Sequence, residues 1–140
     1  MNRHARDYFA MAESYVVAVE GLAEHAEMPQ APFLMLVSHS LELSLKAVLA
    51  QDGRDEEWLM MVGHNLARCH DRARSIGFSG SAEQQLSELV EILDQGHSDQ
   101  RFRYPVLFGG TPRLKGKNTA RTVRLHLEDV RQWVARASER

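Results

Sequence analysis

The chain has 140 residues, of which 44% are hydrophobic, and a formal net charge of −2 at pH 7. This length fits one domain with its own buried core. The apolar runs are shorter than the roughly 20 residues of a membrane span, and the first residues lack the apolar core of a signal peptide, which predicts a soluble cytoplasmic protein without membrane contact. The single cysteine, Cys69, excludes an intramolecular disulfide and a cysteine-rich zinc site.

The small net charge conceals an uneven distribution along the chain. Residues 1–100 contain seven Lys or Arg and sixteen Asp or Glu, giving −9, whereas residues 101–140 contain ten and three, giving +7. A basic segment of this kind is typical of a surface that binds a polyanion. It equally fits two parts of a fold, or of a dimer, that neutralise each other.

The first predicted helix comprises residues 7–26. Its apolar residues recur at helical spacing, and two prolines, Pro29 and Pro32, follow it. We expect the stripe that faces the core to consist of Tyr8, Met11, Tyr15, Val19 and Leu22.

The second predicted helix comprises residues 32–52. Pro32 suits a first helical turn, and Gly53 provides the stop. This segment is apolar on nearly two faces. It should therefore lie in the middle of a bundle, or contact both its own core and a partner chain.

Shorter helices follow in the middle of the chain. Residues 55–62 predict one or two helical turns, and residues 65–76 predict a helix for which Asn65 is a candidate cap. A further helix is expected over 82–95, introduced by a capping box of Ser81 and Gln84.

The last third of the chain contains a basic loop and a final helix. Residues 101–118 lose the helical spacing and are rich in glycine, whereas residues 120–138 regain an apolar stripe. No segment alternates with the period of a strand. The sequence thus predicts one all-α domain over residues 1–140, an up-and-down bundle of four to five helices.

Three polar side chains share one face of the apolar segment 32–52. His39, Glu42 and Lys46 lie at positions i, i+3 and i+7, and groups of this kind cost several kcal/mol to bury unless they are paired. One interpretation is an internal polar network that fixes helix packing. The other is a catalytic or ligand-binding role, since a histidine beside a carboxylate holds a defined tautomer.

Two motif classes are not matched by the sequence. No Glu precedes a His by three residues and no His-x-x-x-His occurs, so we predict no metal and no cofactor. The glycine-rich stretch 109–118 lacks the spacing and the Ser or Thr of a phosphate-binding Walker loop. It remains a candidate flexible basic loop. Cys69 is expected to be a small core residue.

Two stretches together resemble the HEPN domains, which are small all-α modules. The first runs from Ser38 to Leu49 and contains His39, Glu42 and Lys46; the second is Gly63-His64-Asn65-Leu66. The resemblance covers about residues 7–135. It implies a bundle of four or five helices, usually a homodimer, that in many members is a metal-independent ribonuclease of stress, defence or toxin–antitoxin systems. It also makes His64 a member of the structural polar network.

The resemblance implies that ribonucleases of this family carry an Arg and a His separated by four to six residues. Arg103 lies where this motif is expected, but Phe108 stands where the histidine should be. Arg121 and His126 match the spacing on the last helix, yet a helix turns five positions by about 140°, so both reach one cleft only if Arg121 lies at a frayed start. The alternatives are a surface arginine with a flanking histidine and, for Arg103, a nucleic-acid contact or a bridge to Glu42.

The leading hypothesis is therefore a cytoplasmic module that acts on RNA or nucleotides. If it is a ribonuclease, His126 is the acid and base, and Arg121 or Arg103 holds the phosphate. The alternative is a catalytically silent domain, structural or regulatory, that binds a cognate protein partner. The residues expected to contact nucleic acid are Arg101, Arg103, Arg113, Lys115 and Lys117.

Overall fold

The computed structural model describes residues 1–104 and 112–139, and this part of the chain is helical with no strand. The all-α prediction is confirmed. The elements are α1 (Arg3–Ala23), α2 (Gln30–Gln51), α3 (Glu56–Val62), α4 (Leu66–Ser75), α5 (Glu83–Ser98), a 3-10 turn η1 (Arg101–Arg103) and α6 (Gly116–Ser138). The central part of the predicted loop 101–118, residues 105–111, lies outside the described residues.

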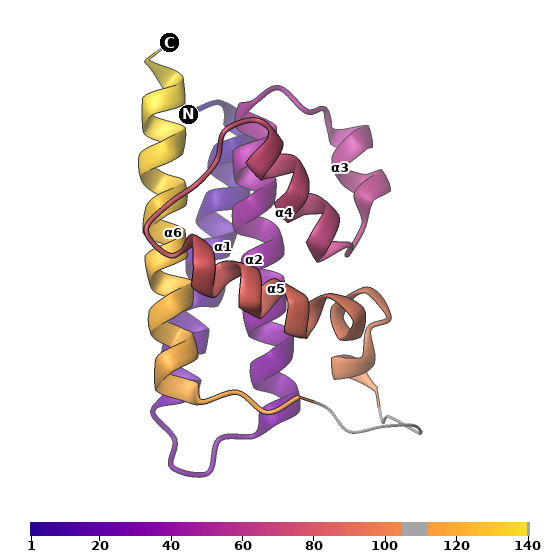
Figure 1. The fold of residues 1–140 in the computed structure, drawn as a ribbon, viewed down its shortest axis with the longest axis vertical. Coiled ribbons are helices and arrows are strands. Elements are labelled where there is room, and N and C mark those ends of the chain that lie inside the picture. The colour runs from indigo at the N-terminus through magenta and orange to yellow at the C-terminus, as the bar shows by residue number, and fades with distance from the viewer. Residues whose placement is uncertain (105–111, 140) are drawn as a thin grey trace.

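Three long helices form the body of the bundle (Figure 1). Helices α1, α2 and α6 run along the long axis, and the two chain ends lie at the same end of the molecule. The terminal ammonium of Met1 donates a hydrogen bond to Ser138 Oγ at 2.6 Å, which joins α1 to the end of α6. Helices α4 and α5 cross the long helices obliquely.

Helix α2 is the central helix of the bundle. It contacts every other helix and η1, and residues 40–50 are buried without exception. By length and hydropathy alone it could span a membrane, but 83% of its apolar window is buried inside the protein. The prediction of a central position is thus confirmed. Helix α2 is also covered by α4, α5 and η1 of the same chain.

Helix α1 faces the core with a stripe that overlaps the predicted one only in part: Val19 is buried, and Tyr8, Tyr15 and Leu22 pack against the core. Its buried residues include Ala5, Ala12 and Ala23, whereas Met11 is 52% exposed and Tyr15 is half-buried. Helix α1 contacts α2 and α6, and its buried face also contains Phe9 and Val16. The predicted stripe is therefore wrong at Met11, and it omits the small alanines of the buried face.

The start of α5 also differs from the prediction. Ser81 and Gln84 form no capping box; instead Asp129 of α6 provides the cap. Asp129 Oδ2 accepts a hydrogen bond from the Ala82 amide at 2.9 Å, and Oδ1 accepts one from Ser81 Oγ at 3.0 Å. Gly80 makes room for this carboxylate, because a Cβ at that position would lie 2.1 Å from Asp129 Cγ.

Candidate functional site

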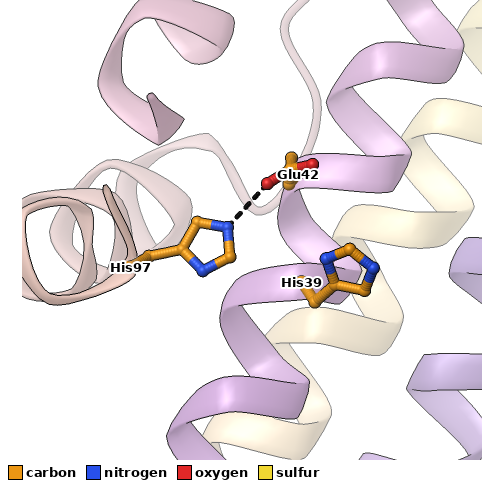
Figure 2. A group of neighbouring side chains, drawn as sticks. All are labelled: His39, Glu42 and His97. Carbon is orange, nitrogen blue, oxygen red and sulfur yellow. Dashed lines mark hydrogen bonds and ion pairs between the residues drawn. The ribbon is translucent and has the colours of Figure 1, made fainter. Parts of the chain in front are cut away.

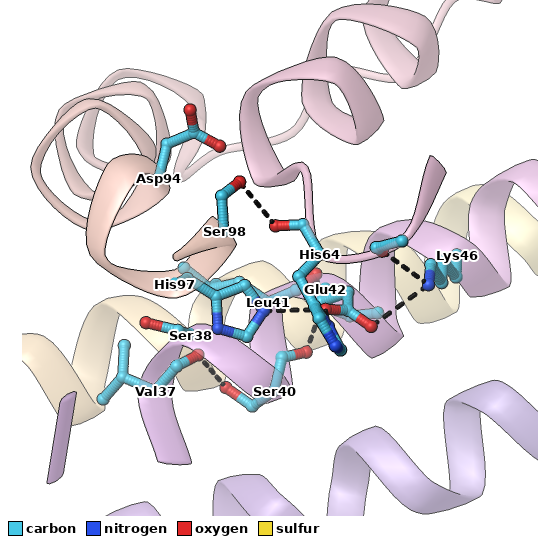
Figure 3. A network of polar contacts seen from close by, with 12 residues as sticks. Val37, Ser38, Ser40, Leu41, Glu42, Lys46, His64, Asp94, His97 and Ser98 are labelled. Carbon is cyan, nitrogen blue, oxygen red and sulfur yellow. Dashed lines mark hydrogen bonds and ion pairs between the residues drawn. The ribbon is translucent and has the colours of Figure 1, made fainter. Parts of the chain in front are cut away.

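A buried carboxylate lies at the centre of a polar cluster where α2, α5 and the α3–α4 turn meet (Figure 3). Glu42 Oε2 accepts a hydrogen bond from Lys46 Nζ at 3.1 Å. Glu42 Oε1 accepts two more, from His64 Nδ1 at 2.8 Å and from His97 Nε2 at 2.7 Å. Lys46 Nζ also donates to the Gly63 carbonyl at 3.0 Å. The cluster therefore ties α2 to both neighbouring segments through charged or polar groups.

The cluster keeps Glu42 ionised although the side chain is only 4% exposed. Burial opposes the charge, but the hydrogen bond from His97, the positive charge of Lys46 and the hydrogen bond from His64 together lower the pKa of Glu42 to about 2. An ionised carboxylate only accepts hydrogen bonds. In their neutral forms, His64 therefore carries its proton on Nδ1 and His97 carries its proton on Nε2, which leaves Nε2 of His64 as the ring nitrogen without a proton.

Local backbone chemistry places His64 beside Glu42. Gly63 adopts a positive φ of 56° at the end of α3, and the Asn65 side chain caps α4 by accepting the Arg68 amide at 3.0 Å. Ser98 Oγ donates to the His64 carbonyl at 3.2 Å (Figure 3). The backbone before and after His64 is therefore fixed, while 34% of the His64 side chain remains exposed to solvent.

The end of α5 brings Arg103 to the same place. Gln100, two residues after the end of α5, adopts a left-handed conformation with φ 58°, and η1 begins at the next residue. Phe102 then packs onto Gly96, where a Cβ would lie 2.4 Å from the phenyl Cζ. As a result, exposed Arg103 and half-exposed His64 line one hollow of about 10 Å³, room for a single water, together with His97 and Gln100.

Three of the four residues predicted to form a structural network are in direct contact. Glu42, Lys46 and His64 share hydrogen bonds, but His39 Nδ1 is buried without a partner in the described part of the chain. The His39 ring packs edge-on against Tyr15, with centroids 4.7 Å apart. Burial lowers the pKa of His39, so its neutral form is favoured.

The donor set of the cluster resembles a metal site in composition (Figure 2). One ligand atom from each of His39, Glu42 and His97 lies within 4.8 Å of the others, with His97 facing the other two from α5. Ligands of tetrahedral zinc, bound at about 2.0–2.2 Å, lie only about 3.4 Å apart. Glu42 is also engaged by Lys46, whose ammonium already balances its charge. The arrangement therefore fits a hydrogen-bonded hub better than a metal centre.

The geometry contradicts the predicted catalytic pair of Arg121 and His126. His126 is 1% exposed; its Nε2 lies 2.9 Å from Ser44 Oγ and its ring packs edge-on against Phe78. Burial lowers the pKa of His126 to about 4, which favours the neutral ring. Arg121 is exposed, so the two side chains do not share a cleft. His126 is therefore a buried histidine of the core.

The predicted nucleic-acid contacts fall into two groups. Arg101 and Arg103 lie on η1, where Arg101 pairs with Asp99 at 3.3 Å and Arg103 forms no bridge to Glu42. Arg113 and Lys115 precede α6, Lys117 lies in its first turn, and all three are exposed. Arg113 and Lys117 line a hollow against the α1–α2 turn. Of all these residues, only Arg103 lines a pocket with a histidine of the Glu42 cluster.

Sequence reasoning missed His97. Helix α5 was expected to end at residue 95, before Gly96, but it continues to Ser98. A signal was present, because His97 follows Leu86, Val90 and Leu93 at helical spacing and so lies on the same buried face.

Comparisons of the chain with protein-family models, with curated proteins and with solved structures found no match.

Proposed function

We propose that the protein cleaves RNA without a metal ion, with His64 as the general base and Arg103 as the phosphate ligand. The observation that carries this proposal is that the two side chains lie at the rim of the same water-sized hollow, beside a buried carboxylate that holds the tautomer of His64. A histidine oriented by a carboxylate exchanges protons near neutral pH, and a guanidinium stabilises the charge of a phosphoryl transition state. The resemblance to HEPN domains supports the same substrate class.

The reaction follows from the free nitrogen of His64. His64 Nε2 takes the proton of a ribose 2′-hydroxyl, the 2′-oxygen attacks phosphorus, and the bond from phosphorus to the 5′-oxygen breaks. Water protonates the leaving 5′-oxygen, and His64 returns its proton to solvent. The products are a 2′,3′-cyclic phosphate and a 5′-hydroxyl, and no oxidant or cofactor is needed. The residues for this chemistry come from a single chain.

The test is cleavage of single-stranded RNA by purified protein in EDTA. We expect cyclic-phosphate ends by mass spectrometry, and a loss of activity of at least about 100-fold in His64→Ala, the typical contribution of a general base. Arg103→Ala should lower activity while leaving the fold intact, because Arg103 is exposed. The matched controls are His4→Ala and Arg6→Ala, which remove exposed residues of α1 and should cleave as the parent does.

A catalytically silent domain gives a different result. Activity that is absent, or equal in the His64→Ala and parent proteins, removes His64 from the chemistry. The Glu42 cluster then serves only to join α2 to α5 and to the α3–α4 turn, and binding of a protein partner becomes the function to test.

A further inference from the structure

A second feature lies outside the Glu42 cluster, between α3 and α4. A groove of about 530 Å³ is lined by Arg54, Trp58, Arg68, Asp71 and Arg72, with Ser75 at its end. This volume falls in the range of small-molecule sites, roughly 300–1,000 Å³. None of these arginines belongs to the basic segment 101–118 on which the sequence-based hypothesis of polyanion binding rested.

The charge of the groove is opposite to that of its surroundings. Residues 1–100 carry a net charge of −9 and contain only seven Lys or Arg, yet three of these seven line this groove. Within the described residues, no carboxylate oxygen lies within 4.0 Å of the guanidinium nitrogens of Arg54, Arg68 or Arg72. Asp71 is the single acidic residue of the lining. Three uncompensated guanidinium groups therefore face one hollow.

The arginines are placed by separate elements of the fold. Gly53 adopts φ 96° at the end of α2, and the Arg54 amide then bonds to the Leu49 carbonyl at 3.1 Å. Arg68 and Arg72 are one helical turn apart on α4, so they lie on the same face. The groove is thus formed by fixed backbone on both sides.

An aromatic ring completes the groove. Trp58 lies in the first turn of α3, where Asp55 Oδ1 accepts its amide at 2.8 Å. The ring is half-buried, and the Arg54 guanidinium lies 5.1 Å from its centroid. An indole beside guanidinium groups offers a surface for a nucleobase next to ligands for a phosphate.

We propose that this groove binds a nucleoside phosphate unit, with the base against Trp58 and the phosphate on Arg68 and Arg72. The planar guanidinium groups match the geometry of phosphate oxygens, and contact with the indole should make the groove bind a nucleotide more tightly than a simple anion. The unit is either a free nucleotide or one nucleotide of single-stranded RNA. Binding here does not depend on the cleavage chemistry of His64, because none of the lining residues belongs to the pocket of His64 and Arg103.

Intrinsic fluorescence provides the assay, because Trp58 is half-exposed at the groove and the second tryptophan, Trp133, is buried. ADP should quench the emission of the parent protein and bind less tightly as salt is raised. In Arg68→Ala/Arg72→Ala the affinity for ADP should fall at least about tenfold. The control, Arg3→Ala/Arg6→Ala, removes two exposed arginines outside the groove and should bind ADP as the parent does.

The role of Trp58 is tested by isothermal titration with ADP and with inorganic pyrophosphate. Trp58→Leu should weaken ADP binding and leave pyrophosphate binding unchanged. Equal effects on both ligands, or equal losses in the groove variant and its control, overturn the proposal, as does the absence of ADP binding. An eight-residue oligoadenylate identifies the source of the nucleotide: binding at least tenfold tighter than ADP assigns the groove to RNA, and similar binding assigns it to free nucleotides.

Discussion

Replacing Glu42 by Gln removes the charge at the centre of the cluster and leaves the shape of the side chain nearly unchanged. Glu42 has a pKa of about 2 in the folded protein, against 4.5 for its ordinary value. At about 1.36 kcal/mol per pKa unit, the folded state therefore favours the carboxylate by about 3 kcal/mol. The substitution leaves the ammonium of Lys46, whose side chain is 8% exposed, without its ion-pair partner. Removing one member of a buried ion pair typically lowers the free energy of unfolding by about 3–5 kcal/mol, which agrees with the value obtained from the pKa of Glu42.

The expected result is a loss of about 3 kcal/mol in the free energy of unfolding at pH 7, measured by urea denaturation with circular dichroism. The sign of the pH dependence follows from the lowered pKa of Glu42. The stabilisation is complete above pH 4.5 and disappears as the pH falls towards 2. The difference between the parent and Glu42→Gln should therefore shrink to about 1.4 kcal/mol at pH 3.

Two further variants separate the charge from the packing. Adding Lys46→Met to Glu42→Gln removes the unpaired cation and should restore at least about 1 kcal/mol. Glu88→Gln changes an exposed glutamate of α5 and should shift stability by less than about 0.5 kcal/mol. A loss below about 1 kcal/mol in Glu42→Gln at pH 7, or a loss that stays constant between pH 7 and pH 3, would refute the account of the cluster.

Three more predictions concern the rest of the fold. The pKa of His126 is lowered from 6.5 to about 4, so acid favours the unfolded state below pH 6.5. The parent should therefore lose about 2.5 kcal/mol of unfolding free energy through His126 between pH 7 and pH 4.5, and His126→Leu should abolish this loss. An unchanged loss in urea titrations of the variant contradicts this. Asp129→Ala should lower the free energy of unfolding by about 1 kcal/mol through the lost cap of α5, whereas Gln84→Ala should lower it by less than about 0.5 kcal/mol. A larger loss in Gln84→Ala than in Asp129→Ala would support the capping box instead. EDTA should leave the thermal midpoint unchanged, because Lys46 already balances Glu42, and a lower midpoint would indicate a bound metal.

Helix boundaries were predictable where a local side chain determines them. Pro32 lies in the first turn of α2, Gly53 takes the left-handed conformation after its end, and the Asn65 side chain caps α4. Each of these residues acts on backbone groups within a few positions, so the sequence alone contains the relevant information. The cap of α5 was missed because the side chain that accepts its hydrogen bonds, Asp129, is 47 residues away.

The polar cluster was predictable only in part for the same reason. Glu42 and Lys46 are one helical turn apart, and their pairing follows from helix geometry. The contact of Glu42 with His97 joins residues 55 positions apart on helices that cross, and no local pattern specifies which helix meets which. His97 was moreover hidden by Gly96, which serves the packing of Phe102 and does not end the helix.

In the Glu42 cluster, the residue that holds the helices together differs from the residue proposed to react. Function should therefore be tested at His64 and not at Glu42. Glu42 holds α2, α5 and the α3–α4 turn together, so its loss would lower activity through unfolding as well as through chemistry. His64 contributes one of three hydrogen bonds to this carboxylate, and a third of its side chain is in solvent. Loss of His64 should therefore destabilise the fold less than loss of Glu42. An activity that disappears in His64→Ala while the unfolding midpoint is retained can be attributed to the imidazole itself.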